Sequence, residues 1–240
     1  MEVEVRCYLA RLQLHENTFF ASREIFDYYE TEPVIGNVAL AYALGFCRSP
    51  YHQPPAPLYA RDLEQLNQRG IYVTPATPAG RPAFAIQSFN ANSDSYWFQF
   101  RPNAVAVSQA QEARAVNYPQ HGRLKMLAVG SMFTFYVMLP ARGEEISRPG
   151  YVRLGKFNSK ARVQWREITW EPAAASPEKV ARVLSPLDFP ENVTLGACDI
   201  VHIRPAVLVK NARLTGPGLR VRETGEFLPW PMRFALPGKE

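Results

Sequence analysis

A length of 240 residues and a hydrophobic content of 47% are enough for a substantial core and exclude a disordered protein. The chain has 21 prolines, more than the average of about 5%, which favours short strands with irregular connections over a helical bundle. The net charge of +5 and the pI near 9.2 indicate attraction to polyanions but do not distinguish RNA, DNA and anionic lipid.

The first predicted element is a strand over residues 3 to 14. Apolar side chains recur at every second position from Val3 to Leu9, and the run continues through Leu12 and Leu14. A period of two is typical of a half-buried strand, so we expect this segment to open a sheet.

Two helices are expected next. Thr31 can cap a helix whose first turn holds Pro33 and which ends near Gly45, because apolar residues follow at helical spacing. Residues 61 to 68 predict a shorter helix that stops at Gly70. A weaker helical pattern covers residues 177 to 184.

The rest of the chain predicts mainly strands. Their expected ranges are 71–73, 84–89, 96–101, 133–139, 161–170, 200–209 and 219–222. This order indicates an α+β fold, a split βαβ core with added hairpins. We expect the core to span residues 1–170, with a β-rich C-terminal extension over residues 171–240 packed on it and a linker at residues 172–177.

Cysteines and the N-terminus bear on the cellular compartment. Cys7, Cys47 and Cys198 are widely spaced and form no CxxC pair, so we expect free thiols, no disulfide framework and no zinc or other metal site. The first six residues carry acids where a signal peptide needs cations, and the apolar run Val38 to Cys47 is too short to span a bilayer. A soluble cytoplasmic protein without membrane contact is therefore expected.

The most basic segment is the decapeptide 153–162, which holds four cations and no acid. A glycine within it permits close backbone approach, and short polar side chains can donate hydrogen bonds to phosphate. The residues expected to contact a polyanion are Arg153, Gly155, Lys156, Asn158, Ser159, Lys160 and Arg162. A solvated face on an edge strand is the competing interpretation.

Strand periodicity extends this segment and distributes its charge. Lys160, Arg162, Gln164 and Arg166 should share one face, while the intervening apolar residues should be buried. Residues 101–162 hold 10 bases and 3 acids, whereas residues 1–50 hold 4 bases and 7 acids. One surface is therefore expected to meet nucleic acid and another to meet protein.

Catalytic motifs are weak. Gly150 to Lys156 has the spacing of a P-loop, but Phe157 stands where magnesium binding needs Ser or Thr. The four histidines are isolated in sequence, although an acid/base role for His15 in RNA cleavage remains open.

Trp97, on the alternating strand 96–101, can stack a nucleotide base or pack in the core.

Four blocks together resemble a known family. They are His15 to Glu24, Tyr29 to Asn37, Gly70 to Ala76 and Arg153 to Arg162. In order and spacing they are similar to the type I-D CRISPR subunit of Cas family five. Arg23, in the first block, is included among the expected RNA-binding residues, as are Arg166 and Trp97.

The resemblance implies a modified RNA-recognition-motif (RRM) or ferredoxin-like core with a β-hairpin thumb, which we place near residues 84–125. It implies a non-catalytic subunit, without a cofactor, in a prokaryotic CRISPR surveillance (Cascade) complex for antiviral defence. The subunit would bind and cap the 5′ handle of the CRISPR guide RNA (crRNA), and it would touch the large subunit and the repeated backbone subunit. Target DNA would be read by base pairing to the guide. The alternatives are a metal-independent endoribonuclease for repeat RNA and a purely structural protein whose basic patch meets an acidic partner.

Overall fold

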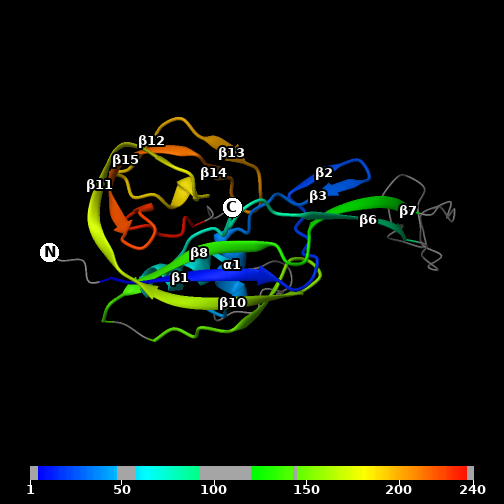
Figure 1. Cartoon of the computed structure of the whole chain (residues 1–240), viewed down its shortest axis with the longest axis horizontal. Helices are drawn as coiled ribbons and strands as arrows, with labels where there is room; N and C mark the ends of the chain where they lie inside the picture. The colour runs from blue at the N-terminus through cyan, green and yellow to red at the C-terminus, as the bar shows by residue number, and fades with distance from the viewer. Residues whose placement is uncertain (1–4, 48–57, 92–119, 143–144, 237–240) are drawn as a thin grey trace, which may run out of the picture.

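The computed structural model describes residues 5–47, 58–91, 120–142 and 145–236. They form a mostly β structure with two α-helices, which confirms the mixed class. The body contains a central antiparallel sheet and a curved C-terminal sheet, and a smaller sheet projects from it (Figure 1).

The central sheet has the strand order β4-β8-β1-β10-β9, and β5 also pairs with β8. The bounds are β1 Val5–Leu14, β4 Tyr72–Val73, β5 Thr77–Pro78, β8 Met132–Pro140, β9 Tyr151–Leu154 and β10 Ser159–Ile168. The chain passes from β1 through both helices to β4, and β8 lies between these two strands. This is a split βαβ arrangement, after which β9 rather than a helix leads into β10.

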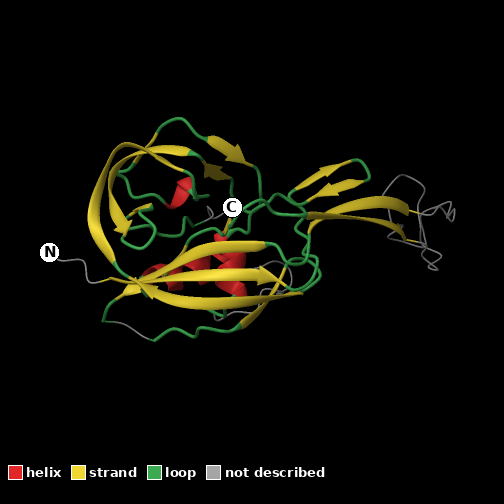
Figure 2. Ribbon diagram, in the orientation of Figure 1, coloured by secondary structure: helices red, strands yellow, loops and turns green. Residues whose placement is uncertain are grey.

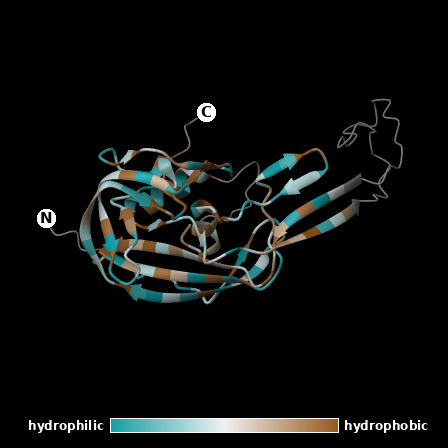
Figure 3. Ribbon diagram, turned by 45° about the horizontal axis from the view of Figure 1, so that its top comes forward, coloured by the Kyte–Doolittle hydropathy of each residue, from teal (hydrophilic) through white to brown (hydrophobic). Residues whose placement is uncertain are grey.

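Strand β1 occupies the centre of this sheet, and its sequence alternates between buried and exposed side chains. Ala10, Leu12 and Leu14 are buried beside apolar residues of β8 and β10, whereas Arg11 and Gln13 are exposed. The alternation of apolar and polar residues along the strands is visible in Figure 3. The predicted first strand is confirmed.

Both helices lie against one face of the central sheet (Figure 2). Helix α1 spans Asn37–Ala43 and α2 spans Tyr59–Gln68, the latter followed by Gly70 with φ +66°. The expected start of the first helix at Thr31 is wrong. The buried Thr31 hydroxyl donates to the Phe20 carbonyl, and backbone bonds between Ile35 and Ala76 keep this segment extended.

The projecting sheet has the order β2-β3-β7-β6. Its strands are β2 Arg23–Ile25, β3 Tyr28–Glu30, β6 Phe84–Ala91 and β7 Gln120–Leu127. β6 and β7 pair as an antiparallel ribbon, and β3 joins β7 in parallel. The expected strand 96–101 and its Trp97 lie outside the described residues.

The C-terminal sheet corrects three predictions. β11 runs unbroken over Trp170–Val180, so residues 172–177 are not a linker and no helix covers 177–184. Pairing with β15 (Ala212–Val221) keeps this segment extended, and a register shift between Ala175 and Glu178 accommodates Pro177. The single strand expected at 200–209 is a hairpin of two strands, β13 (Asp199–Val201) and β14 (Leu208–Lys210).

The remaining elements are β12 Thr194–Leu195, β16 Phe227–Pro229 and the 3-10 helix η1 Pro186–Asp188.

One large apolar cluster joins the sheets and the helices. Leu12 and Phe133 of the central sheet and Leu40 and Leu66 of the helices belong to it, as does Val221 of β15. At about 25 cal/mol per Å² of buried apolar surface, such a cluster is the main stabilising term of the fold. Within the described ranges, no helix is both long and apolar enough to cross a membrane.

Candidate nucleic-acid interface

The turn between β9 and β10 is held against the chain near Phe19. Gly155 has φ +69°, and a Cβ atom there would lie 2.5 Å from the Phe19 carbonyl oxygen. The Lys156 amide donates to the same oxygen at 2.9 Å. Only glycine fits both the left-handed backbone and the close approach, so the turn is fixed at this point.

Two other residues of this turn have structural roles. Ser159 is 2% exposed, and its hydroxyl donates to the Asn17 carbonyl at 2.8 Å. Phe157 is exposed and stacks on Phe19, with ring centroids 5.5 Å apart. The Ser159 hydroxyl is directed inward. We therefore reassign Ser159 from ligand contact to a structural role at this turn.

A groove of about 1750 Å³ lies between β9 with its turn and helix α1. Residues 20–24, 203–206 and 234–236 also line it, together with residues of α2 and of the η1 region. Six of the residues predicted from sequence line this groove: Arg23, Arg153, Gly155, Lys156, Asn158 and Lys160. The tertiary structure therefore gathers most of the predicted site around one cavity.

Cations on the β9 side of the groove remain accessible. Lys156 is exposed. The Arg153 side chain is 64% exposed, although its guanidinium donates to the Asn158 carbonyl at 3.1 Å and lies 3.7 Å from the Glu16 carboxylate. The ammonium group of Lys160 lies 4.5 Å from the centre of the Tyr151 ring. These groups place positive charge along one wall, where a phosphate backbone can be held.

Arg23 lines the groove from a different position, at the start of β2. Its guanidinium forms an ion pair with Glu32 and lies 3.8 Å from Glu30. The hydrogen bond to Glu32 raises the pKa of Arg23 above its usual value. Arg23 therefore stays protonated, and two carboxylates of the same hairpin balance its charge.

Arg204 is a groove residue that sequence reasoning missed. It is an exposed cation in the loop between β13 and β14, next to Pro205. It stands alone in sequence, with no basic run or strand pattern around it. Only the folding of the C-terminal segment against the groove could reveal it.

The predicted ladder on β10 forms a second surface. Arg162, Gln164 and Arg166 are exposed, while Ala161 and Val163 are buried, which confirms the predicted alternation. On the adjacent β1, Gln13 lies opposite Arg162 and Arg11 lies opposite Gln164. Arg162 and Arg166 are not part of the groove lining, and Lys160 is the position where the ladder and the groove meet.

A buried polar cluster supports the floor of the groove. Asp188 accepts hydrogen bonds from the Asn37 amide at 2.7 Å, the Tyr72 hydroxyl at 2.8 Å and the Ala235 backbone at 2.7 Å. Burial raises the pKa of Asp188, although these hydrogen bonds act in the opposite direction. The cluster ties α1, β4, η1 and the C-terminal segment together, so it fixes the groove walls.

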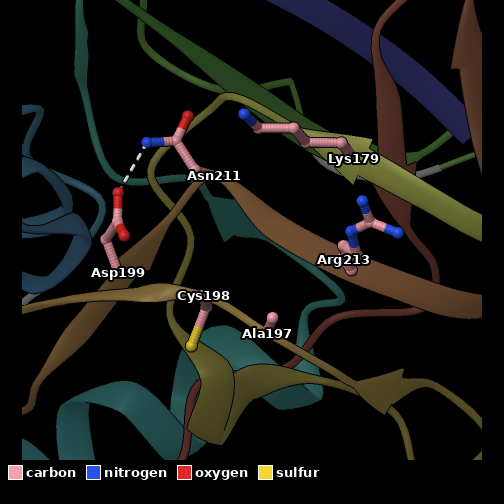
Figure 4. A pocket seen from close by; sticks show the side chains of 6 residues that line it. All are labelled: Lys179, Ala197, Cys198, Asp199, Asn211 and Arg213. Carbon is pink, nitrogen blue, oxygen red and sulfur yellow. Dashed lines mark hydrogen bonds between the residues drawn. The ribbon is translucent and has the colours of Figure 1, made fainter.

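A smaller cavity of about 280 Å³ lies in the C-terminal region (Figure 4). Lys179 of β11 and Arg213 of β15 line it and are directly paired across the two strands. Asn211 donates to Asp199 at 2.7 Å at its edge. These cations belong to a different surface, so they can serve as controls for the groove.

No group of three His, Cys, Asp or Glu residues within the described part of the chain could hold a metal ion. Cations clustered on one face of a protein are typical of nucleic-acid binding. The chain belongs to the type I-D CRISPR-associated protein Cas5/Csc1 family, whose model matches residues 5–236.

No curated protein matches the sequence. Among solved structures, similarity is found to a chain of the type III-B Cmr-beta complex bound to cognate target RNA and AMPPnP. The match covers 90% of this chain and 86% of that chain, with 11% identity and a TM-score of 0.44.

Proposed function

We propose that this protein is a non-catalytic, crRNA-binding subunit of a type I-D CRISPR surveillance complex. It binds and caps the 5′ handle of the guide RNA and bridges the large subunit and the first repeated backbone subunit. The central sheet serves as a modified RRM-like core, with the β6–β7 ribbon as its thumb. The observation that carries the proposal is the groove whose β9 wall presents Arg153, Lys156 and Lys160 together.

Backbone recognition suits this geometry better than base readout. The groove wall offers cations on a turn whose position is fixed by Gly155. The exposed Tyr151 ring on that wall is already in contact with the Lys160 ammonium group, which leaves less of it for a base. Phosphate contacts position a strand without reading its sequence. The guide, held in this way in the cytoplasm, then reads target DNA through base pairing.

Crosslinking tests the proposal directly. The chain is co-expressed with a CRISPR array and the other proteins of its complex, and the retained RNA is crosslinked and sequenced. The variant combines Arg153→Ala, Lys156→Ala and Lys160→Ala. Its matched control removes the same charge elsewhere, with Lys179→Ala, Lys210→Ala and Arg213→Ala.

Crosslinks at the 5′ handle are expected in the wild type and in the control, with a loss of about tenfold or more in the groove variant, since charge-assisted contacts are the stronger hydrogen bonds. Equal RNA retention by both variants would contradict the proposal. If the groove variant keeps its RNA but loses a protein subunit, the purely structural alternative is correct.

A second candidate function is metal-independent cleavage of repeat RNA, and one arrangement at the groove favours it. The His15 and Tyr151 rings meet edge to face with centroids 5.9 Å apart, and Lys160 lies over the Tyr151 ring. Imidazole, phenol and amine can all transfer protons in general acid–base catalysis. Cleavage of labelled repeat RNA in EDTA, abolished by His15→Ala, would establish this activity; intact RNA supports the capping role.

A further inference from the structure

The tip of the β2–β3 hairpin presents large apolar side chains to solvent. Ile25 lies opposite Tyr28, so Phe26 and Asp27 alone form the connection between the two strands. Phe26 is 91% exposed and Ile25 is 50% exposed. Scattered apolar residues are common on protein surfaces, but a nearly fully exposed phenylalanine at the tip of a projecting hairpin is not explained by the fold.

The backbone at this tip is unfavourable for phenylalanine. Phe26 has φ +55°, whereas Asp27 is not among the residues with positive φ. Positive φ at the first residue of a two-residue connection favours glycine there. A bulky residue is strained at positive φ, and burial within this chain does not compensate for that strain.

Charge around the tip differs from charge in the groove. Residues 23–32 contain one base and four acids, and the acids Glu24 and Asp27 flank the apolar pair. The nearest cation on the neighbouring strand is Arg123, which lies opposite Tyr28. The excess of acids disfavours a polyanion and suits an apolar pocket rimmed by cations on another protein.

The hairpin also holds this tip in a fixed position. β3 pairs in parallel with β7, and the Arg123 amide donates to the Asp27 carbonyl at 2.8 Å. Ion pairs join Glu30 to Lys125 and Arg23 to Glu32. A rigid aromatic anchor loses little conformational entropy on binding, which is how dominant interface residues act.

We propose that Ile25 and Phe26 form an anchor that inserts into an apolar, basic-rimmed pocket of another protein subunit in the complex. The inference rests on the proposed function, because that function supplies the complex in which the partner occurs. It assigns protein contact to the hairpin tip and leaves RNA contact to the groove, so the two proposals fail separately.

The substitution Phe26→Gly separates docking from folding. Glycine is favoured at positive φ, so this variant should fold as well as the wild type or better. In tagged co-purification of the co-expressed complex, we expect recovery of one protein subunit to fall at least tenfold while RNA crosslinks to the groove persist. The control is Ile200→Ala, which truncates an aliphatic side chain that is 60% exposed on β13.

Unchanged subunit recovery with Phe26→Gly overturns the inference and leaves the proposed function intact. A second measurement identifies the partner directly, with the photoreactive residue p-benzoylphenylalanine in place of Phe26 in the purified complex. A crosslink to one defined protein subunit is expected. A crosslink to RNA, or none, contradicts the assignment.

Discussion

At the scale of the residue, Gly155 has the most stringent requirement around the groove. It combines positive φ with a backbone approach that leaves no room for a side chain. Gly130 also has positive φ, at +84°, but a Cβ atom there would meet nothing within 4 Å. The two glycines therefore separate the effect of conformation from the effect of contact.

We expect Gly155→Ala to lower the free energy of unfolding by more than Gly130→Ala does. The left-handed conformation accounts for about 1–2 kcal/mol in both variants, and the contact with the Phe19 carbonyl adds to the loss at Gly155 alone. Urea denaturation of both variants measures the difference. Equal losses would show that the turn can move away from Phe19.

Two buried thiols give a pH dependence. Burial is the main reason that the pKa values of Cys7 and Cys47 are raised to about 12. In the unfolded chain a thiol loses its proton near pH 8.5, so between about pH 8.5 and 12 the unfolded state binds fewer protons than the folded state. The stability that these thiols contribute is therefore complete below about pH 8.5 and decreases as pH rises.

The free energy of unfolding of the wild type, from urea denaturation, should accordingly fall by about 1–2 kcal/mol per thiol between pH 8 and pH 10. The double variant Cys7→Ala with Cys47→Ala should lose less over the same interval, because the titrating groups are gone. A parallel decline in both proteins would assign the effect to other groups.

At the scale of the element, a buried arginine joins the C-terminal sheet to the central sheet. Arg182 follows β11 and is 4% exposed; it donates to the Thr134 carbonyl of β8 at 3.0 Å and pairs with Glu226 at 3.0 Å. Its guanidinium also lies 4.4 Å from the centre of the Tyr136 ring. The network fixes how β8 meets the segment that leads into β16.

Arg182→Met should lower the free energy of unfolding by about 3 kcal/mol, since removing one partner leaves polar groups of a buried network unsatisfied. The matched change Arg222→Met breaks an exposed pair with Glu171, whose side chains are 62% and 50% exposed, and should cost less than about 1 kcal/mol. Thermal or urea unfolding of both variants compares them. A small effect at Arg182 would mean that the two sheets are held by apolar contacts alone.

At the scale of the whole molecule, charge is divided between two surfaces. The β9 wall and the β10 ladder are basic, while the hairpin over residues 23–32 is acidic. This division fits a protein that holds RNA on one surface and meets protein with another. It also predicts that RNA binding depends strongly on salt.

Each phosphate contact to a single strand contributes about −0.7 to the slope of log affinity against log salt. Four contacts give a slope near −3 for the wild type, and the variant without Arg153, Lys156 and Lys160 should have a slope near −1. Filter binding of 5′-handle RNA over a salt series measures both. A slope that is the same in both proteins would show that the groove cations do not contact phosphate.

Elements with a local signal could be predicted from the amino-acid sequence. The period-two pattern identified β1, β8 and β10, because one buried face imposes it wherever the strand pairs. The basic decapeptide 153–162 was also predicted as a polyanion contact, since its four cations and Gly155 are contiguous in the chain. The order and spacing of four short sequence blocks also indicated the type I-D CRISPR family, and the family match over residues 5–236 confirms this resemblance.

Contacts between residues far apart in sequence could not be predicted without the folded chain. Arg23, Arg153 and Arg204 line one groove because sheet register and the C-terminal path bring them together, and no local pattern encodes that. Residues 172–177 have the composition of a linker, yet pairing with β15 makes them a strand. Burial of Ser159 and exposure of Phe26 likewise depend on neighbours far away in sequence, because exposure is a property of packing and not of residue type.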